Sequence, residues 1–387
     1  MNRVLNYFIR KVKYIFTFDV VEVFLSIQTY FQIKQVKYFE KTVLIIEPNS
    51  FHGEILPGYI YYFNSLGYKV TLLVRRENYN QGLFSLFKKE ELPNIYCINN
   101  LFLKFLFRKK MNFDFVFFTS TMISEKYGYF GHVFSYFKNS TAGKFGTIFT
   151  EHNFDSLIPQ IEASNVYLNQ LTMLSPLKNE KYKNIAVVNP NYFGEIPVGK
   201  KLNAKKTFIA VGSINQRNRN IDLLFEMVAT IGREYDDDFE VLIVGRGVEK
   251  EMFPNLPKQI GILGELSFND LFKVLNKADY FLPLLDPTFS GHKRYLNGET
   301  TGSKQLILGF SLVPVIHAQF ASVYGFSDDN SILYDDNFTM AIKDAILLDD
   351  KKYLEKRNNI IDLALEVRAE SQKNLKVLLE NQIKLKK

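Results

Sequence analysis

The chain has 387 residues, of which 47% are hydrophobic, and it carries a formal net charge of +7. This length exceeds what one hydrophobic core usually holds, so we expect roughly two or three domains. The single cysteine, Cys97, excludes an internal disulfide framework and fits a reducing compartment. No apolar run reaches the roughly 20 residues of a membrane-spanning helix, and no signal peptide is recognised, so we predict a cytoplasmic protein.

Residues 1–40 form a basic N-terminal segment. Apolar residues recur at helical spacing from Val4 to Phe16, and the chain up to Lys41 holds seven basic and three acidic residues. This pattern predicts an amphipathic helical segment that lies on an anionic membrane surface, on the inner face of the cell membrane. Packing of the helix on the body of the protein is the alternative. Nucleic acid is not expected as a partner, because no nucleic-acid-binding motif is present.

Residues 41–190 are predicted to form a Rossmann-like domain. Apolar, strand-like runs alternate with helical patterns, and each run ends in polar residues. The expected helix covers 55–66, and the expected strands cover 42–48, 69–74, 94–98, 114–120 and 146–152. Proline and glycine then recur between Asn189 and Lys201, which is typical of an interdomain linker.

Residues 200–350 are predicted to form a second domain of the same kind. A helix is expected over 221–233, and strands are expected over 207–213, 239–245, 260–263, 279–285 and 312–316. Repeated strand and helix units of this length predict an α/β fold with a doubly wound parallel sheet. Ligands of such sheets bind at the carboxyl ends of the strands. The last residues, 351–387, have a helical composition.

A small polar segment, Thr300 to Ser303, opens the helix before the last of these strands. Free backbone N–H groups and the helix dipole favour an anion at such a corner. Gly302 would let the backbone approach a phosphate closely, and the hydroxyls of Thr300, Thr301 and Ser303 could donate to it. The alternative is an ordinary helix N-cap, where serine and threonine are common.

Between Thr207 and Ile316 the chain carries an ordered set of motifs: Val211-Gly212, the basic loop with Arg217 and Arg219, Ile243 to Gly247, Leu263-Gly264, Ala278 to Pro283, Glu299, Gly302 and Pro314-Val315-Ile316. Taken in order, these motifs resemble the donor-binding domain of GT-B glycosyltransferases, in particular retaining, family 4-like enzymes that use nucleotide sugars. It implies two Rossmann-like domains that face a cleft. It also implies that the helix at 351–387 crosses back to the N-terminal domain.

The resemblance further implies roles for individual residues. Arg217 and Arg219 would face the diphosphate of the donor, Gly302 and Ser303 would form its backbone cradle, and Glu299 would contact the donor sugar. The other residues assigned to donor binding are Gly212, Ser213, Gly245, Leu263, Lys293, Thr300 and Thr301. The second glutamate of the family, which holds the ribose, is replaced here by Ile307, and Lys304 and Gln305 are the nearby candidates for its task.

For the acceptor side, His152 resembles the first-domain histidine that faces the donor sugar in retaining members. Its imidazole could carry a proton near neutral pH, although a structural histidine is the alternative. If the enzyme inverts, Glu54 or His52 could deprotonate the acceptor hydroxyl, and Glu151 is a third option. A carboxylate favoured by a helix dipole is the alternative explanation of Glu54.

Metal and cofactors are not expected, since no metal-spaced histidine pair and no Asp-x-Asp at a first-domain strand end are present. We therefore predict a metal-independent glycosyltransferase of hexosyltransferase type. It would transfer a sugar from a nucleotide diphosphate sugar to a hydroxyl of a glycan or lipid-linked acceptor, in bacterial surface polysaccharide biosynthesis. The alternatives are a sugar-nucleotide epimerase on the same scaffold and a catalytically degenerate GT-B subunit that binds a partner. A dinucleotide-dependent dehydrogenase is disfavoured, because Gly245-Arg246-Gly247 lacks the third glycine of the fingerprint.

Overall fold

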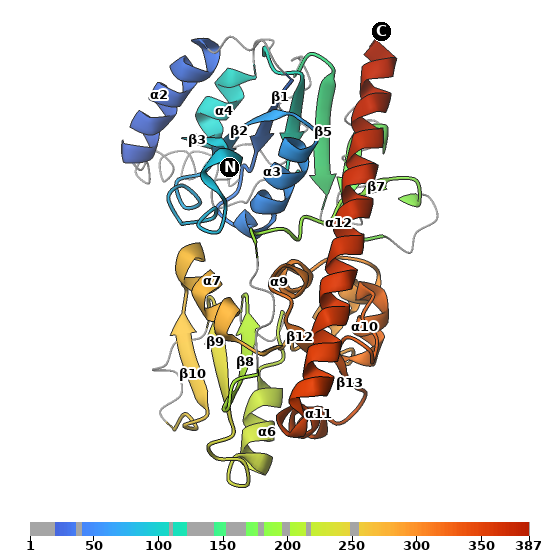
Figure 1. Cartoon of the computed structure of the whole chain (residues 1–387). Helices are drawn as coiled ribbons and strands as arrows, with labels where there is room; N and C mark the ends of the chain where they lie inside the picture. Colours follow the sequence, from blue (N-terminus) through green and yellow to red (C-terminus); the bar gives the residue numbers. More distant parts are fainter. Residues whose placement is uncertain are drawn as a thin grey trace, which may run out of the picture. The chain divides into compact units, whose positions relative to one another are not determined.

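The structure, a computed structural model, divides into two compact units that we describe separately (Figure 1). Unit 1 comprises Met1–Gln81, Lys89–Met173 and Asn374–Lys387, and unit 2 comprises Gly82–Lys88 and Leu174–Lys373. The residues that the structure describes are 20–35, 41–107, 111–121, 143–151, 168–176, 182–195, 202–213, 218–247 and 255–386. The amphipathic pattern between Val4 and Phe16 lies outside these residues.

The first sheet has seven strands in the order β3-β2-β1-β4-β5-β6-β7, and its pairs from β3 to β6 are parallel. Every residue of the central strand β1 is buried, which explains its uninterrupted apolar sequence, because helices cover both faces of such sheets. The strands are β1 (Thr42–Ile46), β2 (Lys69–Val74), β3 (Asn94–Cys97), β4 (Phe115–Phe118), β5 (Gly146–Glu151), β6 (Leu171–Met173) and β7 (Ala186–Val187).

The helices of unit 1 begin at recognisable signals. Asn99 caps α4 by accepting a hydrogen bond from the N–H of Phe102, and α3 has a proline in its first turn. Buried aromatic rings join α3 to the sheet, since Tyr59 and Phe63 both pack on Phe117 of β4. The helices are α2 (Val20–Gln35), α3 (Leu56–Ser65) and α4 (Asn100–Leu106), with short 3-10 helices η1 (Gly53–Ile55), η2 (Lys89–Glu91) and η5 (Leu168–Gln170).

The sheet of unit 2 has six strands in the order β10-β9-β8-β11-β12-β13, again with parallel pairing. Because the strand order reverses beside β8, the carboxyl ends of β8 and β11 mark the edge where doubly wound sheets bind ligands. The strands are β8 (Lys206–Val211), β9 (Phe239–Val244), β10 (Ile260–Gly264), β11 (Tyr280–Phe281), β12 (Val313–His317) and β13 (Ile332–Tyr334).

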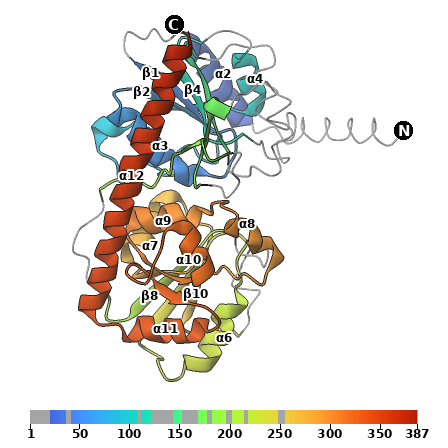
Figure 2. The same cartoon turned by 90° about the vertical axis from the view of Figure 1, so that its right-hand side faces the viewer.

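Side-chain caps begin three of the helices in unit 2, from Ser267, Thr301 and Asn337. At one end of the unit, α6 and α11 lie side by side in both views, and Lys343 of α11 contacts Glu234 just after α6 (Figure 2). The helices are α6 (Asp222–Ile231), α7 (Phe268–Lys277), α8 (Lys293–Leu296), α9 (Gly302–Phe310), α10 (Ala318–Tyr324) and α11 (Phe338–Leu347), with the 3-10 helix η8 (Ser290–His292).

The long helix α12 (Asp350–Lys386) forms the C-terminal part of the chain, as its composition predicts. Its first part belongs to unit 2, where Tyr353 is buried and donates from its hydroxyl to the carbonyl of Asp279. Its residues from Asn374 onward belong to unit 1. The prediction of an α/β protein with two parallel, Rossmann-like sheets is confirmed. Within the described ranges, no helix combines the length and the apolar character needed to cross a membrane.

Candidate functional site

Two glycines mark the carboxyl ends of β8 and β9 in unit 2, and both have positive φ, 132° at Gly212 and 139° at Gly245. A Cβ atom on Gly245 would lie 1.8 Å from the carbonyl oxygen of Gly212. Strand packing therefore already requires a glycine at position 245, whether or not a ligand binds there. The assignment of both glycines to donor binding stays a prediction.

Arg219, which follows β8, is the main cationic group at this edge, and only 5% of it is exposed. Its guanidinium donates to the hydroxyl of Ser303 at 2.9 Å and to the carbonyl oxygens of Asn218 and Val211, at 2.7 and 3.4 Å. These acceptors are all neutral. Burial lowers the pKa of Arg219, and its Nε hydrogen meets no acceptor in the described part of the chain. The structure therefore brings two predicted donor-binding residues, Arg219 and Ser303, into contact.

A second guanidinium, that of Arg294 on α8, lies in the same region. It donates to the side-chain oxygen of Asn218 at 3.0 Å and to the hydroxyl of Tyr295 at 2.6 Å, and it stacks on the Tyr295 ring. The charge of Arg294 is one cause of the lowered pKa of Arg219, after burial. A carboxylate, that of Glu299, has its Oε2 3.7 Å from the Nε of Arg294. Two cations thus share a region in which Glu299 contacts Arg294.

The polar segment before α9 is built as an N-cap. The Thr301 hydroxyl accepts the N–H of Ser303 at 3.1 Å, and its carbonyl accepts the N–H of Lys304 at 3.3 Å. The Thr300 hydroxyl is bonded to that of Ser175 at 2.6 Å. Several groups that we assigned to a phosphate cradle are therefore already engaged, and the N-cap alternative describes this corner without a ligand. Gly302 is the first residue of α9.

The residues near the missing ribose-binding glutamate are also buried in α9. Ile307 is 1% exposed and packs in the apolar core of unit 2, so it has no polar role. Gln305 is completely buried, and neither its amide oxygen nor its nitrogen has a hydrogen-bond partner in the part of the chain that the structure describes. Burial lowers the pKa of Lys304 to about 8, against the opposing charge of Glu370. Buried polar groups without partners are rare, which makes Gln305 a residue of interest.

Sequence reasoning missed His292, which lies in η8 and is fully buried. Its Nδ1 accepts the N–H of Asp286 at 2.9 Å. Burial lowers the pKa of His292, and the charges of Arg219 and Arg294 lower it further. The available signal was the polar loop directly after the predicted strand 279–285, at the same edge of the sheet.

Three other residues that we assigned to donor binding are exposed. Lys293 is exposed on α8, Leu263 is 40% exposed on β10, and Ser213 is exposed after β8. Their roles stay predictions. Arg217 and His152 lie outside the described residues, and for Glu151 the structure describes only the backbone, at the end of β5.

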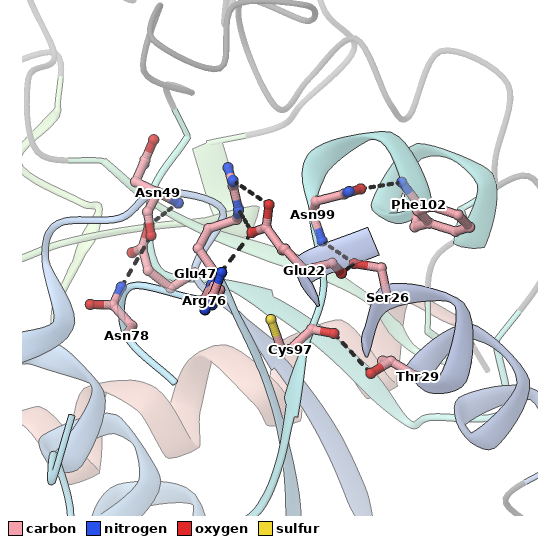
Figure 3. A network of polar contacts seen from close by, with 11 residues as sticks. Glu22, Ser26, Thr29, Glu47, Asn49, Arg76, Asn78, Cys97, Asn99 and Phe102 are labelled. Carbon is pink, nitrogen blue, oxygen red and sulfur yellow. Dashed lines mark hydrogen bonds and ion pairs between the residues drawn. The ribbon is translucent and has the colours of Figure 1, made fainter. Parts of the chain in front are cut away.

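In unit 1, the carboxyl end of β1 carries a buried acid, Glu47, which is 1% exposed (Figure 3). Its Oε2 accepts the hydroxyls of Thr119 and Ser120, each at 2.7 Å, and its Oε1 accepts the N–H of Asn49 at 2.8 Å. Burial raises the pKa of Glu47 to about 7, although the charge of His52 and these hydrogen bonds lower it. Sequence reasoning treated Glu47 as the end of a strand and missed it.

The two acceptor-side candidates of this loop, His52 and Glu54, are adjacent. His52 has φ 67°, and its Nδ1 is 3.5 Å from Oε1 of Glu54. Glu54 lies in the first turn of η1, which leads into α3, so the helix-dipole explanation of this carboxylate also fits. Among the described residues, no group of three or more histidine, cysteine or acidic side chains is placed to hold a metal ion.

Scans of the sequence against protein-family models and curated proteins found no match. Among solved structures, the chain is similar to AviGT4, a glycosyltransferase involved in avilamycin A biosynthesis, with 12% identity and a TM-score of 0.51 over 88% of this chain and 98% of that one. A glycosyltransferase from Rickettsia africae ESF-5 has 12% identity and a TM-score of 0.50, over 89% and 99%. At this identity the likeness shows the fold. The fold is therefore a divergent form of the GT-B glycosyltransferase fold, as the motifs predicted.

Proposed function

We propose that this protein is a glycosyltransferase that moves a sugar from a nucleotide diphosphate donor to a hydroxyl of a glycan or lipid-linked acceptor. The GT-B fold supports this proposal. The observation that carries it is the buried guanidinium of Arg219, at the carboxyl end of β8, which has only neutral hydrogen-bond partners among the described residues.

A buried arginine of this kind is suited to bind an anion. Unlike a carboxyl or an imidazole, a guanidinium does not lose its charge at physiological pH. Burying a charge without a counter-ion is costly, and the nearby Arg294 adds repulsion. An oxygen of a diphosphate would accept the spare Nε hydrogen of Arg219 and neutralise the site.

The same cation would serve catalysis, because negative charge develops on the diphosphate as the sugar leaves. A fixed guanidinium stabilises that charge without reorganisation, and on this proposal no metal ion is needed. Glu299, held by Arg294, is the proposed contact to the donor sugar. On the acceptor side, His52 and Glu54 of unit 1 are the proposed proton carriers, and His152 remains a proposal from the resemblance.

The cellular setting is proposed on the resemblance and the charge alone. The acceptor would be a precursor of bacterial surface polysaccharide. The protein would act in the cytoplasm, and residues 1–40, with their excess of basic side chains, would contact an anionic membrane surface.

The test is calorimetric titration with UDP, GDP, CDP, ADP and TDP, with EDTA present. Arg219→Gln removes the proposed phosphate contact, and Arg357→Gln is the matched control, because Arg357 is another buried arginine of unit 2 whose pKa burial lowers. We expect one diphosphate to bind the wild type and the control alike, and to bind Arg219→Gln about a hundredfold more weakly. Equal binding to all three proteins would remove the proposed role of Arg219.

Binding of no diphosphate would contradict the transferase proposal and favour a degenerate subunit. If one binds, the matching nucleotide sugar separates transferase from epimerase. A transferase needs a glycan acceptor to release the diphosphate at its full rate, whereas an epimerase converts the nucleotide sugar without an acceptor.

A further inference from the structure

The helix α2 of unit 1 buries three polar side chains and exposes several large apolar ones. Glu22, Ser26 and Thr29 are 7, 0 and 3% exposed, whereas Phe24 and Phe31 are 67 and 58% exposed. A helix on the surface of a globular protein normally shows the reverse, with apolar residues against the core. The arrangement of α2 therefore requires an explanation.

The inward side is held by specific polar contacts (Figure 3). Glu22 accepts from Nε and Nη2 of Arg75 at 2.7 and 3.0 Å, and this ion pair is buried. The hydroxyl of Ser26 accepts the N–H of Asn99 at 2.9 Å. Thr29 donates from its hydroxyl to the carbonyl of Cys97, the last residue of β3, at 2.8 Å.

These contacts fix the rotation of the helix about its axis. Turning α2 to hide its apolar side would separate Glu22 from Arg75 and leave a buried charge without its partner, which is strongly unfavourable. The exposed apolar side is therefore part of the folded unit and does not result from weak packing.

The outward side is a continuous stripe. Val20, Phe24, Ile27 and Phe31 follow one another at spacings of three or four residues, which places them on one face of a helix. Val20 and Ile27 are 79 and 40% exposed, and the neighbouring Val21 is 51% exposed. Contiguous apolar surface of this kind marks a site of interaction with a partner or a membrane.

The charge of the sequence up to Lys41 indicates which partner the stripe fits. The chain up to Lys41 holds seven basic and three acidic residues, and one of the three, Glu22, is neutralised by Arg75 inside unit 1. The basic side chains are thus opposed only by Asp19 and Glu40. An exposed apolar stripe within a basic segment matches the acyl boundary and the headgroups of an anionic lipid surface.

We propose that the outward face of α2 inserts into the surface of an anionic membrane. This inference deepens the proposed membrane contact of residues 1–40 by assigning it to one face of one helix. It does not depend on sugar transfer, because lipid binding is measured without a donor.

The absence of tryptophan from the sequence allows a direct test. Phe24→Trp introduces a single tryptophan into the stripe, and Leu347→Trp is the matched control, because Leu347 is 62% exposed on α11 of unit 2. Emission is recorded with vesicles of phosphatidylcholine alone and with vesicles of phosphatidylcholine and phosphatidylglycerol in equal parts. We expect a blue shift of Phe24→Trp only with the mixed vesicles, reduced by high salt, and no shift of the control.

Three outcomes would overturn the proposal. The Phe24→Trp emission could stay unchanged with the mixed vesicles. It could be blue-shifted without lipid in proportion to protein concentration, which would mean that a second copy of the chain covers the stripe. It could be blue-shifted without lipid at every concentration, which would mean that the chain's own residues cover it.

A second pair of variants tests the stripe without a probe. Phe24→Ser with Phe31→Ser removes two rings that make none of the polar contacts of α2, and Met340→Ser with Leu347→Ser is the control on α11. In co-sedimentation with the mixed vesicles, we expect the first pair to bind at least about tenfold more weakly and the control to bind like the wild type. Unchanged binding of the first pair would contradict the proposal, and thermal unfolding verifies that both variants fold.

Discussion

In each unit a buried ionisable side chain lies at the carboxyl end of a central strand, an acid (Glu47) in unit 1 and a base (Arg219) in unit 2. At the end of β1, Glu47 is surrounded by three hydrogen-bond donors. Near the end of β8, Arg219 is surrounded by neutral acceptors, and one of its donors is unused within the described residues.

The difference follows from the chemistry of the two groups. A carboxyl responds to burial by keeping its proton, and burial accordingly raises the pKa of Glu47 to about 7. A guanidinium cannot respond in this way, because its pKa is too high. Near neutral pH, protonation can therefore remove the buried charge of Glu47 in unit 1. Arg219 in unit 2 stays a buried cation whose hydrogen-bond acceptors among the described residues are neutral.

The buried ion pair of Glu22 and Arg75 is an internal reference for this comparison, because Arg75 has the carboxylate that Arg219 lacks. We expect Glu22→Ala to lower the free energy of unfolding by about 4 kcal/mol, since it leaves Arg75 as a buried, unpaired cation. Urea titration measures the loss. The double variant Glu22→Ala/Arg75→Met should recover much of it, and an equal or larger loss in the double variant would contradict this explanation.

The comparison also predicts a pH dependence for Glu47. Its carboxyl ionises near pH 4.5 in the unfolded chain and near 7 in the folded one. Between these pH values the folded protein holds a proton that the unfolded chain has lost, so stability falls as the pH rises and levels off above 7. In the wild type, the free energy of unfolding should fall by about 3 kcal/mol over this pH range. We expect Glu47→Gln to lack this fall.

Urea titrations of the wild type and Glu47→Gln from about pH 4 to about pH 8 measure the difference in the free energy of unfolding between the two proteins. This pH range includes the pKa of Glu47 in both the unfolded and the folded chain. Glu355→Gln, on an exposed position of α12, is the control for the loss of a carboxylate. If the free energies of unfolding of the wild type and Glu47→Gln change with pH in parallel, burial does not control the protonation of Glu47.

The smallest expected effect is that of Arg219→Gln on the protein without ligand. Because this variant removes a charge that has no counter-ion, we expect the free energy of unfolding to change by less than about 1 kcal/mol or to rise. Pyrophosphate should raise the melting temperature of the wild type but not of the variant. A loss comparable to that of Glu22→Ala would mean that Arg219 has a structural role instead of a ligand-binding one.

Sequence reasoning located the strands and the edge of unit 2 at which they end. Arg219 and Ser303 were assigned to one site although 84 residues separate them, and their side chains are in contact. The two side chains can meet because the carboxyl ends of parallel strands converge on one edge whatever the length of chain between them. Their assignment to donor binding, which came from the resemblance, stays a prediction. Glu47 and His292 were missed, since their importance depends on burial and on neighbours from other elements.

The sequence by itself determined the α/β class, the order of strands and helices and the basic character of the N-terminal segment, because periodicity and composition are local properties. Only the tertiary structure decided which charges are paired. It gave Arg75 a carboxylate from α2, left Arg219 with neutral acceptors, and turned an apolar stripe of α2 outward. Periodicity identifies the apolar face of a helix, but the partners of its polar face decide which side points inward.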